Sequence, residues 1–289
     1  MPVPITQRKG CSQVLDIFNY PFMVNALIVG VLIAVCCALL GVVLVLKRYS
    51  MIGDGLSHVG FGALSVAAVL NLSTPIYLSL PVVTVSAFFL LRITENSKVN
   101  ADAAIAVISS SALAIGVFIA SINGTNINLQ QYMFGSILSV GRSDIVISVI
   151  LAVFVIAMYF LFYNKIFAIT FDENFSQATG IRTGFYNTVI SLLTAITIVV
   201  GMRMLGTLLI SAMIIFPALT SMRLCKRFAT VIITSVIISV FCVLSGLFTS
   251  FTFKDVPVGA TIVIFNLIVF LVFLLISLIC RKYSKKTRD

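Results

Sequence analysis

The sequence predicts an all-α membrane protein: a polytopic bundle of transmembrane helices with about eight or nine spans. Of its 289 residues, 60% are hydrophobic and only 10% are charged, and the mean hydropathy is +1.17. The apolar residues form blocks close to the roughly 20 residues that a helix needs to cross a bilayer. A soluble domain of this length requires many more charged residues to cover its surface, so composition excludes a soluble fold.

Nine apolar blocks are separated by polar or turn-forming residues, and each predicts one span. We expect a single transmembrane domain over residues 22–281, with an N-terminal segment at 1–21 and a basic cytoplasmic tail at 282–289. The predicted spans are Met23–Leu46, Asp54–Leu70, Pro75–Leu91, Ala103–Ile122, Ile145–Phe162, Tyr186–Val200, Leu205–Met222, Ala229–Ser250 and Val258–Ile279.

The net charge of +10 reflects membrane topology and does not indicate a nucleic-acid partner. The basic residues lie in short loops and at the C-terminal end, and cytoplasmic loops of membrane proteins carry an excess of Lys and Arg. Placing the C-terminus in the cytoplasm leaves few basic residues outside, whereas the opposite orientation reverses this bias. The five outside are Arg8, Lys9, Arg142, Arg203 and Lys254.

The second block begins with a carboxylate and the only histidine of the chain, Asp54 and His58. Four residues apart on a helix, the two side chains share one face and can hold one divalent cation. These ligand types suit zinc, manganese or ferrous iron. A second interpretation is equally compatible with the spacing: Asp54 caps the helix N-terminus and His58 is a packing residue.

Two ligands are too few for a closed metal site. If two copies of the chain form a dimer about a two-fold axis, two such pairs supply four ligands around one path. The four glycines at positions 53, 55, 60 and 62 are expected to let helices approach closely there.

A cytoplasmic region at about residues 164–184 contains a short amphipathic helix, acidic at its start and ended by Gly180. It can lie on the membrane surface or form the contact through which a cytoplasmic partner moves the spans. The polar outer loop at 123–131 is either a dock for an external donor protein or a solvated connection. The chain has no G-x-x-x-x-G-K-[ST] phosphate loop, so any ATP hydrolysis must occur on a partner.

Several motifs, in order along nearly the whole chain, resemble the permease subunits of bacterial ABC transporters that import zinc, manganese or iron. Gly53-Asp54-Gly55-Leu56-Ser57-His58 is similar to the family's G-D-A-L-S-H, with Gly55 where the family often has Ala. The other matching segments are 101–105 (ADAAI), 132–138 (YMFGSIL), 177–181 (QATGI), 206–212 (GTLLISA), 216–218 (FPA) and 257–261 (PVGAT).

The resemblance implies a fold like that of type II ABC importers in the bacterial plasma membrane, and a transport subunit that is not itself an enzyme. It implies a second permease copy, identical or paralogous, with metal passing through the dimer interface by alternating access. Two cytoplasmic ATPase subunits and an extracellular or periplasmic metal-binding protein complete the expected assembly, surrounded by membrane lipids. The cargo is zinc or manganese in preference to iron, with no permanently bound cofactor.

The resemblance also assigns candidate site residues. Asp54 and His58 are expected to contact the metal. The segment 172–181 looks like a coupling helix that inserts into the ATPase, and its expected contact residues are Asp172, Glu173, Gln177, Ala178 and Gly180.

Two other classes of function make different predictions. A gradient-driven secondary transporter or channel works without an ATPase and usually shows inverted repeats, which this sequence lacks. An intramembrane metalloprotease needs H-E-x-x-H or paired intramembrane aspartates, and a single histidine excludes the first pattern.

Overall fold

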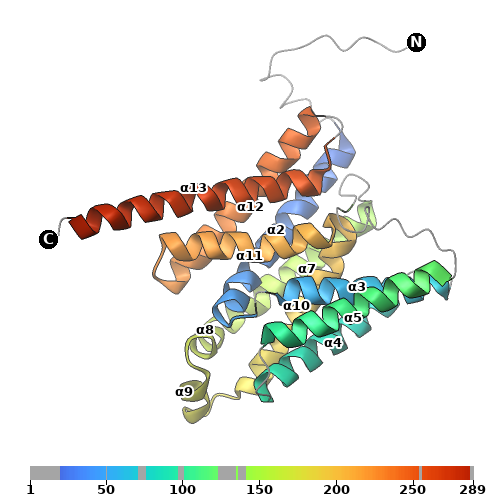
Figure 1. Ribbon diagram of the computed structural model, residues 1–289, viewed down its shortest axis with the longest axis horizontal. Coiled ribbons are helices and arrows are strands. Elements are labelled where there is room, and N and C mark those ends of the chain that lie inside the picture. The colour runs from blue at the N-terminus through green and yellow to red at the C-terminus, as the bar shows by residue number, and fades with distance from the viewer. Residues whose placement is uncertain are drawn as a thin grey trace, which may run out of the picture.

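The computed structural model describes residues 20–49, 51–70, 76–96, 101–122, 135, 141–253 and 256–286, and within these ranges every regular element is a helix. Figure 1 shows their arrangement. The helices are α2 (Pro21–Leu46), α3 (Ile52–Val69), α4 (Ile76–Asn96), α5 (Ala101–Ile122), α7 (Arg142–Leu161), α8 (Tyr163–Phe171), α9 (Glu173–Ala178), α10 (Thr183–Leu205), α11 (Thr207–Leu224), α12 (Phe228–Thr252) and α13 (Val258–Lys286).

The predicted all-α, multi-span fold is confirmed. Eight of the described helices are long and apolar enough to cross a membrane, and α4 adds a shorter apolar stretch at Leu78–Leu90. Each of the nine predicted spans therefore corresponds to a helix. The main difference is at the C-terminus, where α13 continues through Lys286, beyond the predicted end of the span at Ile279.

α2 lies at the centre of the bundle and packs against α7, α10, α11 and α12. Apart from Asn25, its side chains are apolar all round, as expected for a helix with neighbours on every side. Ile33, Leu40 and Leu44 are among its largest fully buried side chains. α10 is buried to a similar extent, and its buried Thr194 and Thr197 hydroxyls donate to carbonyls of their own helix at 2.7 and 2.8 Å. These two buried hydroxyls are thus satisfied by the backbone of their own helix, without water.

α3, α4 and α5 pack together as a second group beside this centre (Figure 1). α3 and α5 meet at a pair of glycines, Gly62 and Gly116. A Cβ added at Gly62 would lie 2.9 Å from the backbone oxygen of Ala112, and one added at Gly116 would lie 2.9 Å from the Cα of Gly62. Only glycine fits at this contact, which brings the two backbones together as small residues do in membrane helix pairs.

The outer helices expose apolar side chains rather than charged ones. Phe118 on α5, Ile150 on α7, Ile237 on α12 and Leu275 on α13 are each more than half exposed. A soluble protein does not leave such continuous apolar faces in water, so these faces fit the hydrocarbon of a bilayer.

Candidate metal path and coupling region

Asp54 and His58 lie together on one face of α3. Their Oδ2 and Nε2 atoms are 3.5 Å apart, and the side chains are 37% and 23% exposed respectively. The predicted i, i+4 arrangement is therefore present. Both side chains are partly exposed, whereas the residues between them, Gly55, Leu56 and Ser57, are buried.

The alternative in which Asp54 caps the helix is wrong. Met51 occupies the N-cap position and makes no side-chain cap, whereas Asp54 lies within the first turn. Its carboxylate still benefits from the positive end of the helix dipole, but it is directed to His58. The side chain is thus available to bind a cation.

The glycines around this pair pack within the chain. A Cβ on Gly53 would lie 3.1 Å from Ile214 of α11, and a Cβ on Gly55 would lie 2.6 Å from Ile105 of α5. Close approach at Gly53 and Gly55 occurs within the chain and seats α3 between α5 and α11. The carboxylate and imidazole are consequently held on a helix whose position is fixed on two sides.

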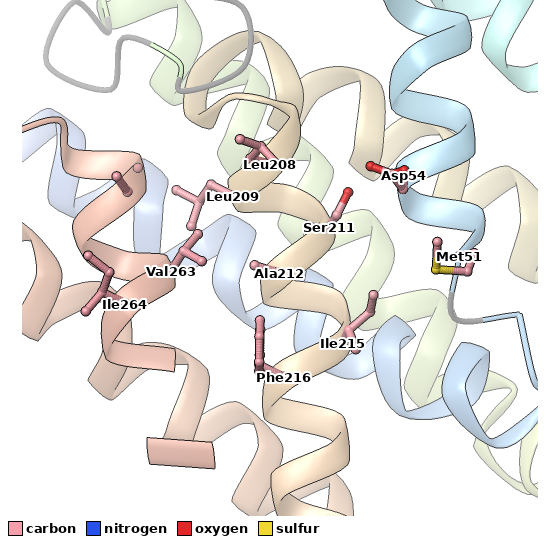
Figure 2. Close-up of a pocket in the computed structure, with 12 residues that line it drawn as sticks. Met51, Asp54, Leu208, Leu209, Ser211, Ala212, Ile215, Phe216, Val263 and Ile264 are labelled. Atoms are coloured by element: carbon pink, nitrogen blue, oxygen red, sulfur yellow. The ribbon is translucent and has the colours of Figure 1, made fainter. Parts of the chain in front are cut away.

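A pocket of about 450 Å³ opens beside Asp54, between α3, α11 and α13. Figure 2 shows Asp54 on α3 facing Ser211 on α11 across it. The rest of its lining is nonpolar and does not include His58, so Asp54 and Ser211 are the side chains of the lining that could offer oxygen ligands to a cation there. The lining residues are Met51, Asp54, Leu208, Leu209, Ser211, Ala212, Ile215, Phe216, Gly259, Ala260, Val263 and Ile264.

One chain supplies an incomplete metal site. In the part of the chain that the structure describes, no group of three His, Cys, Asp or Glu side chains lies close enough to hold an ion. A carboxylate and an imidazole can bind zinc, manganese or ferrous iron, with the remaining positions filled by water or by groups from another molecule. Such a site suits a transient stop, because ions that move through must also leave.

The second candidate region is formed by α8 and α9, which extend from one end of the bundle (Figure 1). Asp172 is the N-cap of α9, and its Oδ1 accepts the backbone N–H of Phe175 at 2.9 Å. Gly180, two residues after the last helical residue, has φ +84° and stops the helix. The N–H of Ile181 donates to the carbonyl of Ser176 at 3.0 Å. The short helix ended by Gly180 is therefore present as predicted.

The predicted coupling residues do not all face the same way. Asp172, Gln177, Ala178 and Gly180 are exposed. The carboxylate of Glu173 instead binds Lys47 of α2 at 3.4 Å and Asn187 of α10 at 2.6 Å.

Phe175, which the sequence analysis did not single out, is 65% exposed on the same short helix. The sequence signal that could have identified Phe175 is its position: an aromatic residue between the acidic start of this helix and the glycine that follows its end.

The polar outer loop predicted at 123–131 lies outside the described residues.

A bundle with eight described helices long and apolar enough to cross a membrane defines a polytopic membrane protein. The ABC 3 transport family matches residues 19–277, and the chain belongs to this family. It is thus an ABC transporter permease of the metal-transport type, a multi-pass bacterial membrane protein that is not an enzyme.

Relatives with described functions extend over almost the whole chain. The manganese import system permease protein ScaB of Streptococcus gordonii is 28% identical over 270 residues, covering 93% of this chain and 96% of the relative. A probable iron transport system membrane protein of Haemophilus influenzae is 30% identical over 275 residues, covering 95% and 96%. Another relative from that organism is described as a high-affinity zinc uptake system membrane protein.

Among solved structures, PsaBC from Streptococcus pneumoniae in complex with a Fab is similar with a TM-score of 0.80. The sequences are 26% identical, and the match covers 91% of this chain and 95% of that one. The shared helical arrangement agrees with the predicted importer-type permease fold.

Proposed function

We propose that the chain is the membrane permease of an ATP-driven importer for a divalent metal, zinc or manganese, and that Asp54 and His58 contact the metal on its way. The observation that carries the proposal is the open carboxylate–imidazole pair at 3.5 Å beside an apolar pocket. A partly exposed carboxylate on a membrane helix is costly if it faces lipid, so it belongs on a path or an interface.

A second copy of the permease would complete this arrangement. Two chains that present Asp54 and His58 to each other would bring two carboxylate–imidazole pairs around one path. Four protein ligands would then surround the ion, the number typical of a protein zinc site. The metal would be delivered by an extracellular or periplasmic binding protein and released into the cytoplasm by alternating access.

Energy for the cycle would come from two cytoplasmic ATPase subunits docked on α9. The exposed surface of α9 offers Phe175 with Gln177 and Ala178 around it, and buried aromatic anchors dominate many protein interfaces. The capped, short helix would transmit the motion of the ATPase as a rigid unit.

The test is metal accumulation in bacterial cells that lack their own importers. The permease is expressed with its ATPase and binding protein, zinc, manganese and iron are offered, and cell metal is measured by mass spectrometry. We expect accumulation of one metal that disappears when the ATPase is omitted. Accumulation without the ATPase would overturn the proposal and favour a gradient-driven transporter or channel.

The docking role of α9 makes a separate prediction. Replacing Phe175 by Ala should weaken the permease–ATPase complex by about 2 kcal/mol, roughly 30-fold in Kd, because an exposed aromatic anchor is lost. Binding of purified ATPase to permease in nanodiscs measures this. Phe241→Ala on α12, which removes a similarly exposed ring from an apolar span, is the matched control and should leave binding unchanged. If the ATPase binds Phe175→Ala permease as tightly as it binds the wild type, Phe175 is not part of the interface.

A further inference from the structure

A closed polar triad connects the end of α2 to α9 and α10. The Lys47 ammonium lies 3.4 Å from Glu173 Oε2 and donates to Asn187 Oδ1, while Asn187 Nδ2 donates to Glu173 Oε1 at 2.6 Å. Each member therefore contacts the other two, and Lys47 lies 126 positions from Glu173 and 140 positions from Asn187 in the sequence. The lysine side chain is only 7% exposed, although an ammonium group is strongly hydrated in water.

The three residues lie at informative places in the fold. Glu173 is the first residue of α9, the proposed coupling helix, and Asn187 is near the start of α10. Lys47 is the C-cap of α2, the central helix, and the chain then turns directly into α3, which carries Asp54 and His58. α9 itself packs mainly on α8 and α10, so the ion pair with Lys47 joins it to the helix that precedes the metal pair.

Hydrogen bonds of the described residues also connect the end of α2 to the start of α3. Arg48 has φ +63°, a left-handed conformation that usually favours glycine, and the N–H of Tyr49 donates to the carbonyl of Leu44 at 2.8 Å. The N–H of Ile52 then donates to the carbonyl of Tyr49 at 3.1 Å. Through these bonds Tyr49 contacts both the last turn of α2 and the first residue of α3, so a displacement of Lys47 can reach the start of α3.

We propose that Lys47 is a positioning residue that carries ATPase-driven movement of α9 to Asp54 and His58 on α3. It does so through its ion pair with Glu173, and Asn187 holds both side chains in place by hydrogen bonds. The inference rests on the proposed ATP-driven function. A movement of α9 that carried Glu173 away would separate a nearly buried ammonium from its carboxylate, which costs free energy, so movement of Lys47 together with Glu173 is favoured. The triad thereby makes α9 and the start of α3 move together.

The test compares uptake with hydrolysis in proteoliposomes that hold the permease, its ATPase and the binding protein, supplied with ATP and either zinc or manganese. In Lys47→Met, which keeps the length of the side chain but removes its charge, we expect hydrolysis to continue while metal ions transported per ATP fall at least tenfold. Glu173→Gln should lower the same ratio. The exchange Lys47→Glu with Glu173→Lys should recover a large part of it.

Lys165→Met is the matched control, because it removes the same charge from an exposed position on neighbouring α8 and should keep the wild-type ratio. A wild-type ratio in both Lys47→Met and Glu173→Gln would overturn the role of the triad while leaving ATP-driven import intact. If the Lys47→Met permease does not assemble with its ATPase, the Glu173→Gln variant tests the role of the triad instead. This variant is expected to assemble because its amide can still form a hydrogen bond with Asn187. A wild-type complex without ATP-dependent uptake would instead refute the proposed function itself.

Discussion

Replacing either member of the carboxylate–imidazole pair is expected to abolish metal uptake while leaving the protein folded. Asp54→Asn keeps the shape of the side chain but loses its charge, and His58→Ala removes the ring. Each change takes away half of the protein ligands that one chain offers. Altering groups that merely support a ligand costs about 10- to 100-fold, so loss of a ligand should lower uptake by about 100-fold or more.

The measurement is the initial rate of zinc and manganese accumulation in cells, normalised to the amount of folded permease. Ser65→Ala is the matched control on the same helix. It removes a buried hydroxyl that only bonds the carbonyl of Phe61 at 3.0 Å, so uptake should stay at the wild-type level. Normal uptake by a well-folded His58→Ala protein would show that His58 is a packing residue and does not bind the metal.

The largest effect on folding is expected at the contact between Gly62 and Gly116. Even Ala at position 62 would place a Cβ 2.9 Å from the Ala112 oxygen, and overpacking of this kind costs about 1–3 kcal/mol. Leu adds three further carbons at a backbone contact that cannot yield without separating α3 from α5. Gly62→Leu should therefore remove most of the folded protein.

Size-exclusion chromatography in detergent and thermal unfolding measure this loss. Gly184→Leu is the matched control, because a Cβ on Gly184 in α10 meets nothing within 4 Å. That variant should elute and unfold like the wild type. A Gly62→Leu protein as stable as the Gly184→Leu protein would show that α3 and α5 do not pack as described.

The spans could be predicted from the sequence because each is an uninterrupted apolar block, and lipid leaves the backbone few alternatives to a helix. Their ends were harder to predict. The break between α10 and α11 falls at Gly206, with φ +89°, whereas the sequence analysis assigned Leu205 to the later span. Arg203 led the sequence analysis to end the earlier span at Val200, but α10 continues past this arginine to Leu205, and only the backbone geometry places the break at Gly206.

The pairing of Asp54 with His58 could be anticipated because it depends on helical spacing alone. The inward contacts of Glu173 could not, because its partners Lys47 and Asn187 come from distant parts of the sequence. Nor could the sequence tell that Gly53 and Gly55 serve packing within the chain. A pattern of small residues is the same whether the neighbour is α5, α11 or a second copy.

The central claim, that this permease imports a divalent metal at the expense of ATP along a path that includes Asp54 and His58, is tested most directly in a purified system. Proteoliposomes containing the permease, its ATPase and the binding protein are given labelled zinc or manganese, with either ATP or a non-hydrolysable analogue. Uptake of one metal that requires hydrolysis and is lost in His58→Ala is the predicted result. Uptake that proceeds equally with the analogue, or equally in the His58→Ala protein, would contradict the account.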